Sequence, residues 1–371
     1  MARGLTLGVE EEFLVVDPVL RGVVTDGRPV LEPLDRQGLV GGQDGSYDQE
    51  LHLSMIESRT PVCQSLDQVR AELQRLRARL VQAAAEAGRW VVSAGSLPMT
   101  DWRGQRITPK PRYQQIAQLH QQVARQQVIC GCHVHVGISD RETAVQVLNR
   151  VRPWLPVLLA ISASSPFWMG RDTGYASYRT ILWGGWPTAG MPYPHRSAAE
   201  YRDVVQSLID TGTIVDGGQI YWDIRLGVEH DTVEFRIADA CTTVDETVLQ
   251  AGLCRALVRT CMDEAARGQL LPDVRPELLQ AAKWRAARFG LDDDLIDVLA
   301  AEAVPAPVLL GRFLGYLRPA LEDLGDWGKI EALAEQTQRR GISAQRQRRV
   351  FAHAQRLEQV VDLLVTETRL C

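Results

Sequence analysis

Three adjacent carboxylates interrupt an apolar run in the stretch Leu5-Thr6-Leu7-Gly8-Val9-Glu10-Glu11-Glu12-Phe13-Leu14-Val15-Val16. The apolar neighbours predict a β-strand that is buried over most of its length. Side chains alternate across a strand, so Glu10 and Glu12 share one face and Glu11 points to the other. Two carboxylates on one buried face repel each other unless a cation lies between them. The pattern therefore predicts a site for Mg²⁺, which prefers oxygen ligands. An edge strand with solvated glutamates is the alternative.

The overall composition is that of a soluble globular protein. The 371 residues are 45% hydrophobic and 23% charged, and the net charge of -5 offers no basic surface for nucleic acid. No apolar run reaches membrane-spanning length, and the N-terminus lacks the pattern of a signal peptide. Seven scattered cysteines suit reduced thiols better than a disulfide framework. We therefore expect a cytoplasmic protein that has neither a membrane nor a nucleic-acid partner.

A second acidic stretch covers residues 47–61 and contains Glu50 and Glu57. Residues seven apart share one face of a helix but lie on opposite faces of a regular strand. A bulged strand would let both carboxylates point inward. Glu57 is the stronger candidate for the metal site, because it sits between apolar residues and a strand-ending Thr-Pro. A surface ion pair of Glu57 with Arg59 is the competing interpretation.

Two histidines follow in the segment Cys130-Gly131-Cys132-His133-Val134-His135. The Cys-x-Cys-His-x-His spacing resembles a zinc site. In a strand, however, His133 and His135 share one face while the cysteines point the other way. We therefore expect two site histidines and two core cysteines. A neutral imidazole can bind a metal or stabilise charge.

Two further segments carry candidate binding residues. Residues 170–192 are rich in Gly and aromatic side chains, and a loop of that length is usually functional. Tyr178 and Arg179 are its candidates for substrate binding, with Arg179 as a carboxylate or phosphate clamp. A packed surface loop is the alternative.

Residues 221–238 have a hairpin pattern in which Glu234 and Arg236 share one face, and Arg225 lies on the neighbouring strand. Cross-strand salt bridges are the alternative there.

The remaining pattern predicts mostly helices. Residues 22–45 predict a hairpin followed by a loop, and residues 100–112 predict an exposed loop near the site. A long amphipathic helix is predicted to begin at Ser65 and to end at Gly88. Ser139 is predicted to begin a second helix with a capping box to Glu142, and Ser197 to cap a third. The last third is predicted to be helical, over 243–267, 276–289, 293–302, 306–323, 326–339 and 344–368.

Several of these motifs together resemble one known family, the type 2 glutamate–cysteine ligases of the YbdK carboxylate–amine ligase type. The motifs are Gly8–Phe13, Gly131–Gly137, Gly170–Gly174, Pro187–Pro192, Thr232–Arg236 and Trp284–Leu291. The resemblance spans nearly the whole chain. It implies an α+β, glutamine-synthetase-like catalytic domain over residues 1–371, with a curved antiparallel sheet backed by helices and a helix-rich part from about residue 243.

The resemblance also implies roles for single residues. Arg236 would face a transferred phosphoryl group, and His135 would act beside it. Residue type, and not the resemblance, makes Tyr178, Arg179 and Arg225 the candidates for contact with substrate. The implied metal ligands are Glu10, Glu12, Glu50, Glu57, His133 and Glu234.

The activity implied by the resemblance is ATP- and Mg²⁺-dependent joining of a small carboxylate to a small amine through an acyl phosphate. The amide bond would be γ-glutamyl if the acid is glutamate, and the chain would be a weak glutamate–cysteine ligase. A metal-dependent amide hydrolase on the same scaffold, without ATP, is the alternative; Arg236 favours the ligase, because phosphoryl transfer needs an arginine facing the metals. A homodimer is compatible with the sequence.

Overall fold

The computed structural model describes residues 5–42 and 45–370, and its centre is an antiparallel sheet. The strand order is β2-β3-β1-β5-β9-β8, and β4 also pairs with β1. The first strand, β1, pairs with β3, β4 and β5 and lies inside the sheet, so the edge-strand alternative is wrong. The strands of this sheet are β1 (Leu7–Val16), β2 (Ser46–Gln49), β3 (Met55–Arg59), β4 (Trp90–Val92), β5 (Cys132–Gly137), β8 (Ile224–Leu226) and β9 (Thr232–Phe235).

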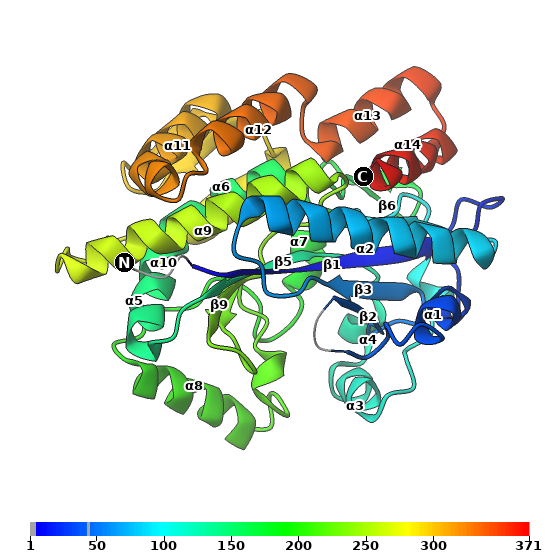
Figure 1. Cartoon of the computed structure of the whole chain (residues 1–371), viewed down its shortest axis with the longest axis horizontal. Coiled ribbons are helices and arrows are strands. Elements are labelled where there is room, and N and C mark those ends of the chain that lie inside the picture. Colours follow the sequence, from blue (N-terminus) through cyan, green and yellow to red (C-terminus); the bar gives the residue numbers. More distant parts are fainter. Residues whose placement is uncertain (1–4, 43–44, 371) are drawn as a thin grey trace.

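Helices cover one face of this sheet (Figure 1). The long helices α2 (Leu66–Glu86) and α9 (Val244–Ala266) pack on β1 and on each other, and α11 (Ala306–Asp323) and α12 (Trp327–Arg340) pack on α9. On the opposite side of the sheet, α3 (Pro111–His120) and α8 (Ala198–Asp210) lie apart from each other (Figure 1). The fold therefore has one face closed by helices and one face on which side chains are more accessible.

The remaining elements complete the α+β architecture. They are α1 (Arg28–Asp35), α4 (Gln122–Arg125), α5 (Arg141–Val151), α6 (Leu155–Ser162), α7 (Tyr178–Trp183), α10 (Pro276–Phe289), α13 (Ser343–Ala354), α14 (Leu357–Arg369), three short 3₁₀ helices, η1 (Trp102–Gly104), η2 (Arg152–Trp154) and η3 (Gly217–Gln219), and the small hairpins β6 (Phe167–Trp168) with β7 (Arg171–Asp172) and β10 (Asp294–Asp297) with β11 (Glu302–Pro305).

The alternation of side chains along β1 decides what each face of the sheet contains. Leu7, Val9 and Phe13 are buried on the helix side, together with Glu11. Leucines at helical spacing bind α2 to this face, and the Ser65 hydroxyl accepts a hydrogen bond from Gln68 N at the start of that helix. The prediction for this helix is confirmed.

Several local predictions were wrong. One helix is predicted over 344–368, but two helices, α13 and α14, form there, and the segment 170–192, predicted as a loop, contains α7. Residues 28–35 form α1, a helix with Pro33 inside it, where a hairpin and loop are predicted. Residues 294–305 form the β10–β11 hairpin, although 293–302 is predicted to be helical. Helix α5 is capped by Asp140, whose carboxylate accepts from Thr143 N, and not by Ser139.

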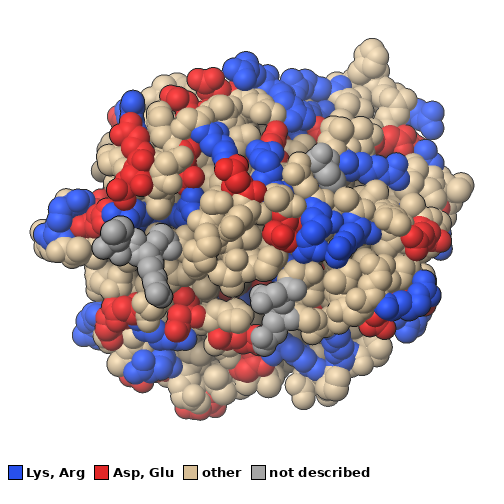
Figure 2. Space-filling view, in the orientation of Figure 1, with Lys and Arg blue, Asp and Glu red and all other residues tan. Residues whose placement is uncertain are grey.

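On the face shown in Figure 2, acidic and basic side chains are interspersed. Within residues 5–42 and 45–370, no helix has both the length and the apolar character that crossing a membrane requires.

Candidate active site

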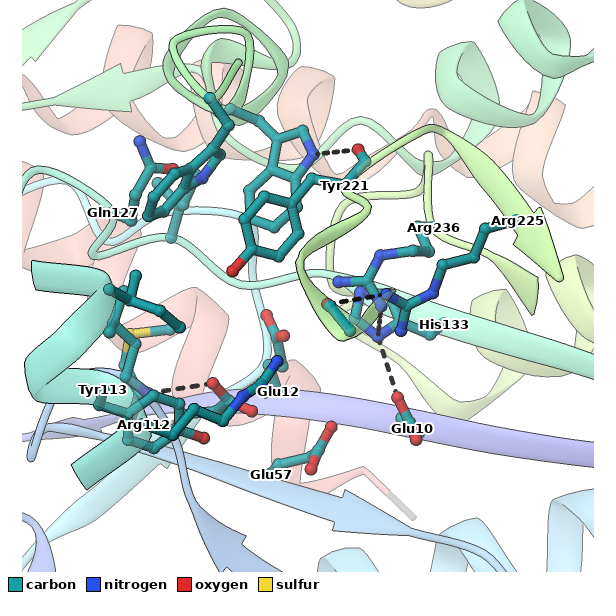
Figure 3. Close-up of a pocket in the computed structure, with 18 residues that line it drawn as sticks. Glu10, Glu12, Glu57, Arg112, Tyr113, Gln127, His133, Tyr221, Arg225 and Arg236 are labelled. Carbon is teal, nitrogen blue, oxygen red and sulfur yellow. Dashed lines mark hydrogen bonds and ion pairs between the residues drawn. The ribbon is translucent and has the colours of Figure 1, made fainter. Parts of the chain in front are cut away.

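A cavity of about 210 Å³ lies over the accessible face of the sheet (Figure 3). Four glutamates line it, Glu10, Glu12, Glu50 and Glu57. A second hollow of about 560 Å³ shares Glu10 and Glu57 with it and reaches His135 and Glu234. The two hollows also share Arg112, Gly218 and Arg225, and we call them together the groove.

Strand register brings the predicted metal ligands together. Glu12 is paired with Glu57 across β1 and β3, and Glu10 is paired with His133 across β1 and β5. His135 is paired with Glu234 across β5 and β9. We call this surface the carboxylate face; it consists of Glu10, Glu12, Glu57, His133, His135 and Glu234.

Glu50 reaches the same cavity from another position. It follows β2 directly, in the turn that joins β2 to β3. The acidic stretch 47–61 is thus two strands of a hairpin, and no bulged strand is needed for Glu50 and Glu57 to face the same cavity. Arg59 forms an ion pair with Glu57 at 2.8 Å, but Glu57 is buried, so this pair lies inside the groove.

The two histidines both contact Glu10. His133 Nδ1 lies 3.0 Å from Glu10 Oε2, and His135 Nε2 lies 3.4 Å from Glu10 Oε1. The Nε2 atom of His133 is buried without a hydrogen-bond partner in the described part of the chain. Cys132 is buried on the other side of β5, in the cluster that contains Leu7 and Val9, as alternation along the strand predicts. Cys130 is also buried, but it precedes β5 and packs in the cluster that contains Leu14 and Met55, so its predicted orientation is wrong.

Burial and repulsion between neighbours shift the pKa values of the carboxylates in this groove. Burial raises the pKa of Glu57 well above its usual range, and repulsion from Glu10 and Glu50 adds to the shift. Burial likewise raises the pKa values of Glu12 and Glu50. For Glu10, burial acts in the same direction, but His135 and His133 outweigh it and hold its pKa well below the usual range.

Two arginines close the groove on one side (Figure 3). Arg225 donates from Nε to Glu234 Oε2 at 2.6 Å, and Arg236 donates to Glu234 Oε1. Burial would raise the pKa of Glu234, but both guanidinium groups outweigh it and lower that pKa. The Arg225–Glu234 contact is a cross-strand salt bridge, which the sequence offers as the alternative to a functional site in this hairpin. Both side chains nevertheless line the groove. The Nε atom of Arg236 is buried without a partner in the described chain.

Arg179 and Tyr178 lie outside the cavity lining. Arg179 is buried and donates to the carbonyl oxygens of Arg236 and Ile237, and it lies 3.7 Å from Asp239. Its guanidinium therefore supports the backbone behind Arg236. Tyr178 packs against Trp168 at the start of α7.

The other end of the cavity is aromatic, and the predicted residues do not include it. It is formed by Trp183, Trp186 and Tyr221, with Gln127 beside them. Tyr113 also lines the cavity, but it lies next to Arg112, nearer the glutamates (Figure 3). The segment 100–112 reaches the site through Arg112, which lines the cavity, but Pro111 and Arg112 already belong to α3 and not to a loop. The tryptophans of the segment 170–192 could have indicated this aromatic end from the sequence, since aromatic side chains in a connecting segment favour a binding role.

The donor set fits a divalent cation. Two groups, Glu10 with His135 and Glu234, and Glu10 with Glu57 and His133, each offer ligand atoms within 4.8 Å of one another. Oxygen-rich sets of this kind suit Mg²⁺ or Mn²⁺, and a cation would offset the repulsion that raises the pKa of Glu57.

The family model described as "Glutamate-cysteine ligase family 2(GCS2)" matches residues 6–363. The chain is 45% identical over 368 residues to "Putative glutamate--cysteine ligase 2-2" of Frankia casuarinae and 42% identical over 363 residues to "Putative glutamate--cysteine ligase 2" of Rhodopirellula baltica. These matches cover 99% and 98% of this chain. The chain spans 42% of the length of the Frankia casuarinae relative and 96% of that of the Rhodopirellula baltica relative.

Solved structures support the fold at low sequence identity. A glutamate–cysteine ligase from Francisella tularensis in complex with AMP has a TM-score of 0.73 at 11% identity, covering 99% of this chain and 89% of that one. A bifunctional glutathione synthetase from Pasteurella multocida has a TM-score of 0.69 at 14% identity, covering 99% of this chain and 53% of that one.

Proposed function

This chain belongs to glutamate–cysteine ligase family 2, and we propose that it joins a small carboxylic acid to a small amine in an ATP-dependent reaction. One observation carries the proposal. The carboxylate face lies beside Arg236, so groups that would hold divalent cations and a group that would neutralise phosphate charge share one groove. Phosphoryl transfer needs this combination.

The chemistry explains why ATP is required. A carboxylate anion is a poor target for an amine, because it is resonance-stabilised and negatively charged. Transfer of the terminal phosphoryl group of ATP to one carboxylate oxygen gives an acyl phosphate and ADP. The amine nitrogen then attacks the acyl carbon, and inorganic phosphate leaves. Magnesium ions held by Glu10, Glu12, Glu57, His133 and Glu234 would supply charge neutralisation to the phosphates when bound.

The chain's own residues have separate tasks in this proposal. Arg236 neutralises charge on the phosphoryl group in transit, since its guanidinium faces the groove. Arg225 is a positioning residue, because its two contacts with Glu234 hold that carboxylate in place. The aromatic end around Trp183 and Tyr221 encloses the organic part of a substrate and excludes water, which protects an acyl phosphate from hydrolysis.

The first substrates to test are glutamate and cysteine, which the names of the relatives mention. A panel of other small carboxylates and amines extends the test, because the cavity lining does not select one acid by residue type alone. If the acid is glutamate, the product carries a γ-glutamyl bond.

The experiment uses a carboxylate labelled with ¹⁸O. An acyl-phosphate route transfers one ¹⁸O atom from the acid to the released phosphate, and release requires both acid and amine. Glu10→Gln and Arg236→Ala should lose this transfer, whereas Arg348→Ala should keep it, because Arg348 pairs with Asp172 outside the groove. Phosphate without ¹⁸O would contradict the route. Metal-dependent amide hydrolysis without ATP would support the hydrolase instead.

A further inference from the structure

A separate cavity of about 320 Å³ lies between η2, the segment 191–193 and the start of α10. Its lining is Arg152, Met191, Pro192, Tyr193, Pro276, Glu277, Leu279 and Gln280. None of these residues lines the groove on the carboxylate face. This volume is at the lower end of the range for small-molecule sites.

Arg152 is the unusual residue of this cavity. It is only 6% exposed, and its single hydrogen bond runs from Nε to the carbonyl oxygen of Asn149 at 3.2 Å. Within the described residues no carboxylate forms an ion pair with it, and its two terminal nitrogens have no acceptor. Burial lowers the pKa of Arg152, and no neighbouring acid opposes that shift.

A buried cation without a counter-charge is costly. Several other buried arginines in the described part of the chain are neutralised, such as Arg77 by Glu11 and Arg255 by Asp326, whereas the buried Arg150 donates only to the carbonyl oxygen of Gln269. Arg152 differs from them because its guanidinium lines a cavity that is large enough for a small molecule. An anion in that cavity would supply the missing charge.

The cavity walls define the kind of anion. Met191, Pro192 and Leu279 offer apolar surface, which suits a hydrocarbon body. Glu277 stands at the exposed rim, paired with Arg275, and would repel a doubly charged phosphate. A single guanidinium matches one planar carboxylate through two parallel hydrogen bonds.

We propose that this cavity binds a small monocarboxylate with an apolar body, whose carboxylate pairs with Arg152. The site is distinct from the ligase groove and needs neither ATP nor a metal. It therefore stands or fails independently of the proposed function.

Methionine methyl groups provide a direct test. The chain has six methionines; Met191 lines this cavity, and Met55 lines the catalytic one. In protein labelled with ¹³C at the methionine methyls, sodium butyrate should shift the Met191 signal along a saturating curve and leave the Met55 signal unchanged. The variant Met191→Leu assigns the signal. Butyramide, the neutral analogue, and inorganic phosphate should each bind at least about tenfold more weakly than butyrate.

A substitution of the arginine completes the test. Arg152→Gln should weaken butyrate binding about tenfold or more, and its melting temperature without ligand should not fall, because it removes an unpaired buried charge. Equal shifts of Met191 with butyramide, or a butyrate shift that persists in Arg152→Gln, would overturn the proposal. A shift of the Met55 signal alone would also overturn it, and so would an unchanged Met191 signal at the highest soluble concentration of butyrate. The comparison of butyrate with butyramide needs only the wild-type protein, so it holds even if the variant does not fold.

Discussion

The two faces of β1 bury carboxylates in opposite ways. On the helix side, Glu11 accepts two hydrogen bonds from Arg77, at 3.0 and 2.7 Å, and a third from the Thr247 hydroxyl at 2.6 Å. On the other side, Glu10 and Glu12 meet further carboxylates from β3 and from the β2–β3 turn, together with histidines whose ring nitrogens are partly unpaired.

The difference separates structure from chemistry. A buried carboxylate with a bidentate arginine is neutralised, and it needs nothing from solution. A buried group of carboxylates with raised pKa values lacks a matched cationic partner for each member, and in the proposed function divalent cations take that place. Three neighbouring residues of identical type thus face two different environments, and their parity along the strand decides which one each residue meets.

The largest expected effect separates rate from stability. Arg236→Ala should reduce the turnover number about a thousandfold or more, because an arginine facing the phosphoryl group contributes about 10³–10⁵ in rate. Its unfolding free energy should change little, because Glu234 keeps Arg225. Steady-state release of ADP, with Arg348→Ala as the control, measures the effect. A loss of less than about tenfold would show that Arg236 does not face the reacting group.

The reverse pattern is expected on the helix side. Arg77→Met leaves the Glu11 carboxylate buried without its partner, so urea unfolding should show a loss of about 3–5 kcal/mol. The turnover number per folded molecule should stay close to that of the wild type. Arg75→Met on the same helix is the matched control, since Arg75 pairs with Glu72 at the partly exposed surface and should cost less than about 1 kcal/mol. Equal losses in both variants would remove the contrast between the faces.

A smaller effect concerns pH in protein that is kept free of metal with EDTA. The pKa of Glu57 is raised by burial and then by Glu10 and Glu50, so its folded form binds more protons than its unfolded form above about pH 4.5. Its contribution to stability is fully present below that pH and is lost as the pH rises through the folded pKa. Glu57→Gln removes this loss. At about pH 8 the variant should therefore be more stable than the wild type, on the order of 1 kcal/mol, and the difference should shrink toward pH 4.5.

The urea midpoints of the wild type and of Glu57→Gln, compared across this pH range, measure the effect. Glu72→Gln is the control, because Glu72 lies at the partly exposed surface outside the groove. A variant that is less stable than the wild type at every pH would mean that Glu57 is already neutralised by Arg59.

Much of the site could be predicted because its residues lie on regular strands. The parity of Glu10, Glu12, His133 and His135 follows from the two-residue period alone, and both β1 and β5 keep that period through the site. The resemblance to known ligases predicted the family and an antiparallel sheet backed by helices, and the family match and the observed sheet confirm these two predictions.

Other parts could not be predicted, because tertiary contacts decide them. Helix α1 is short and contains a proline, and the burial of Val30, Leu31 and Leu34 offsets a poor local propensity. The hairpin after α10 has short mixed segments whose period fits a helix equally well. For Arg179, residue type alone could not show that backbone carbonyls already use its donors.

The most direct test of the central claim is the effect of Mg²⁺ on thermal unfolding. The wild-type protein should melt at a higher temperature in Mg²⁺ than in EDTA, because ions that bind the folded carboxylate face stabilise it by mass action. Glu57→Gln should lose most of that gain, and Glu72→Gln should keep it. Equal melting temperatures of the wild type in Mg²⁺ and in EDTA, or a gain that survives in Glu57→Gln, would contradict the assignment of this face to divalent cations.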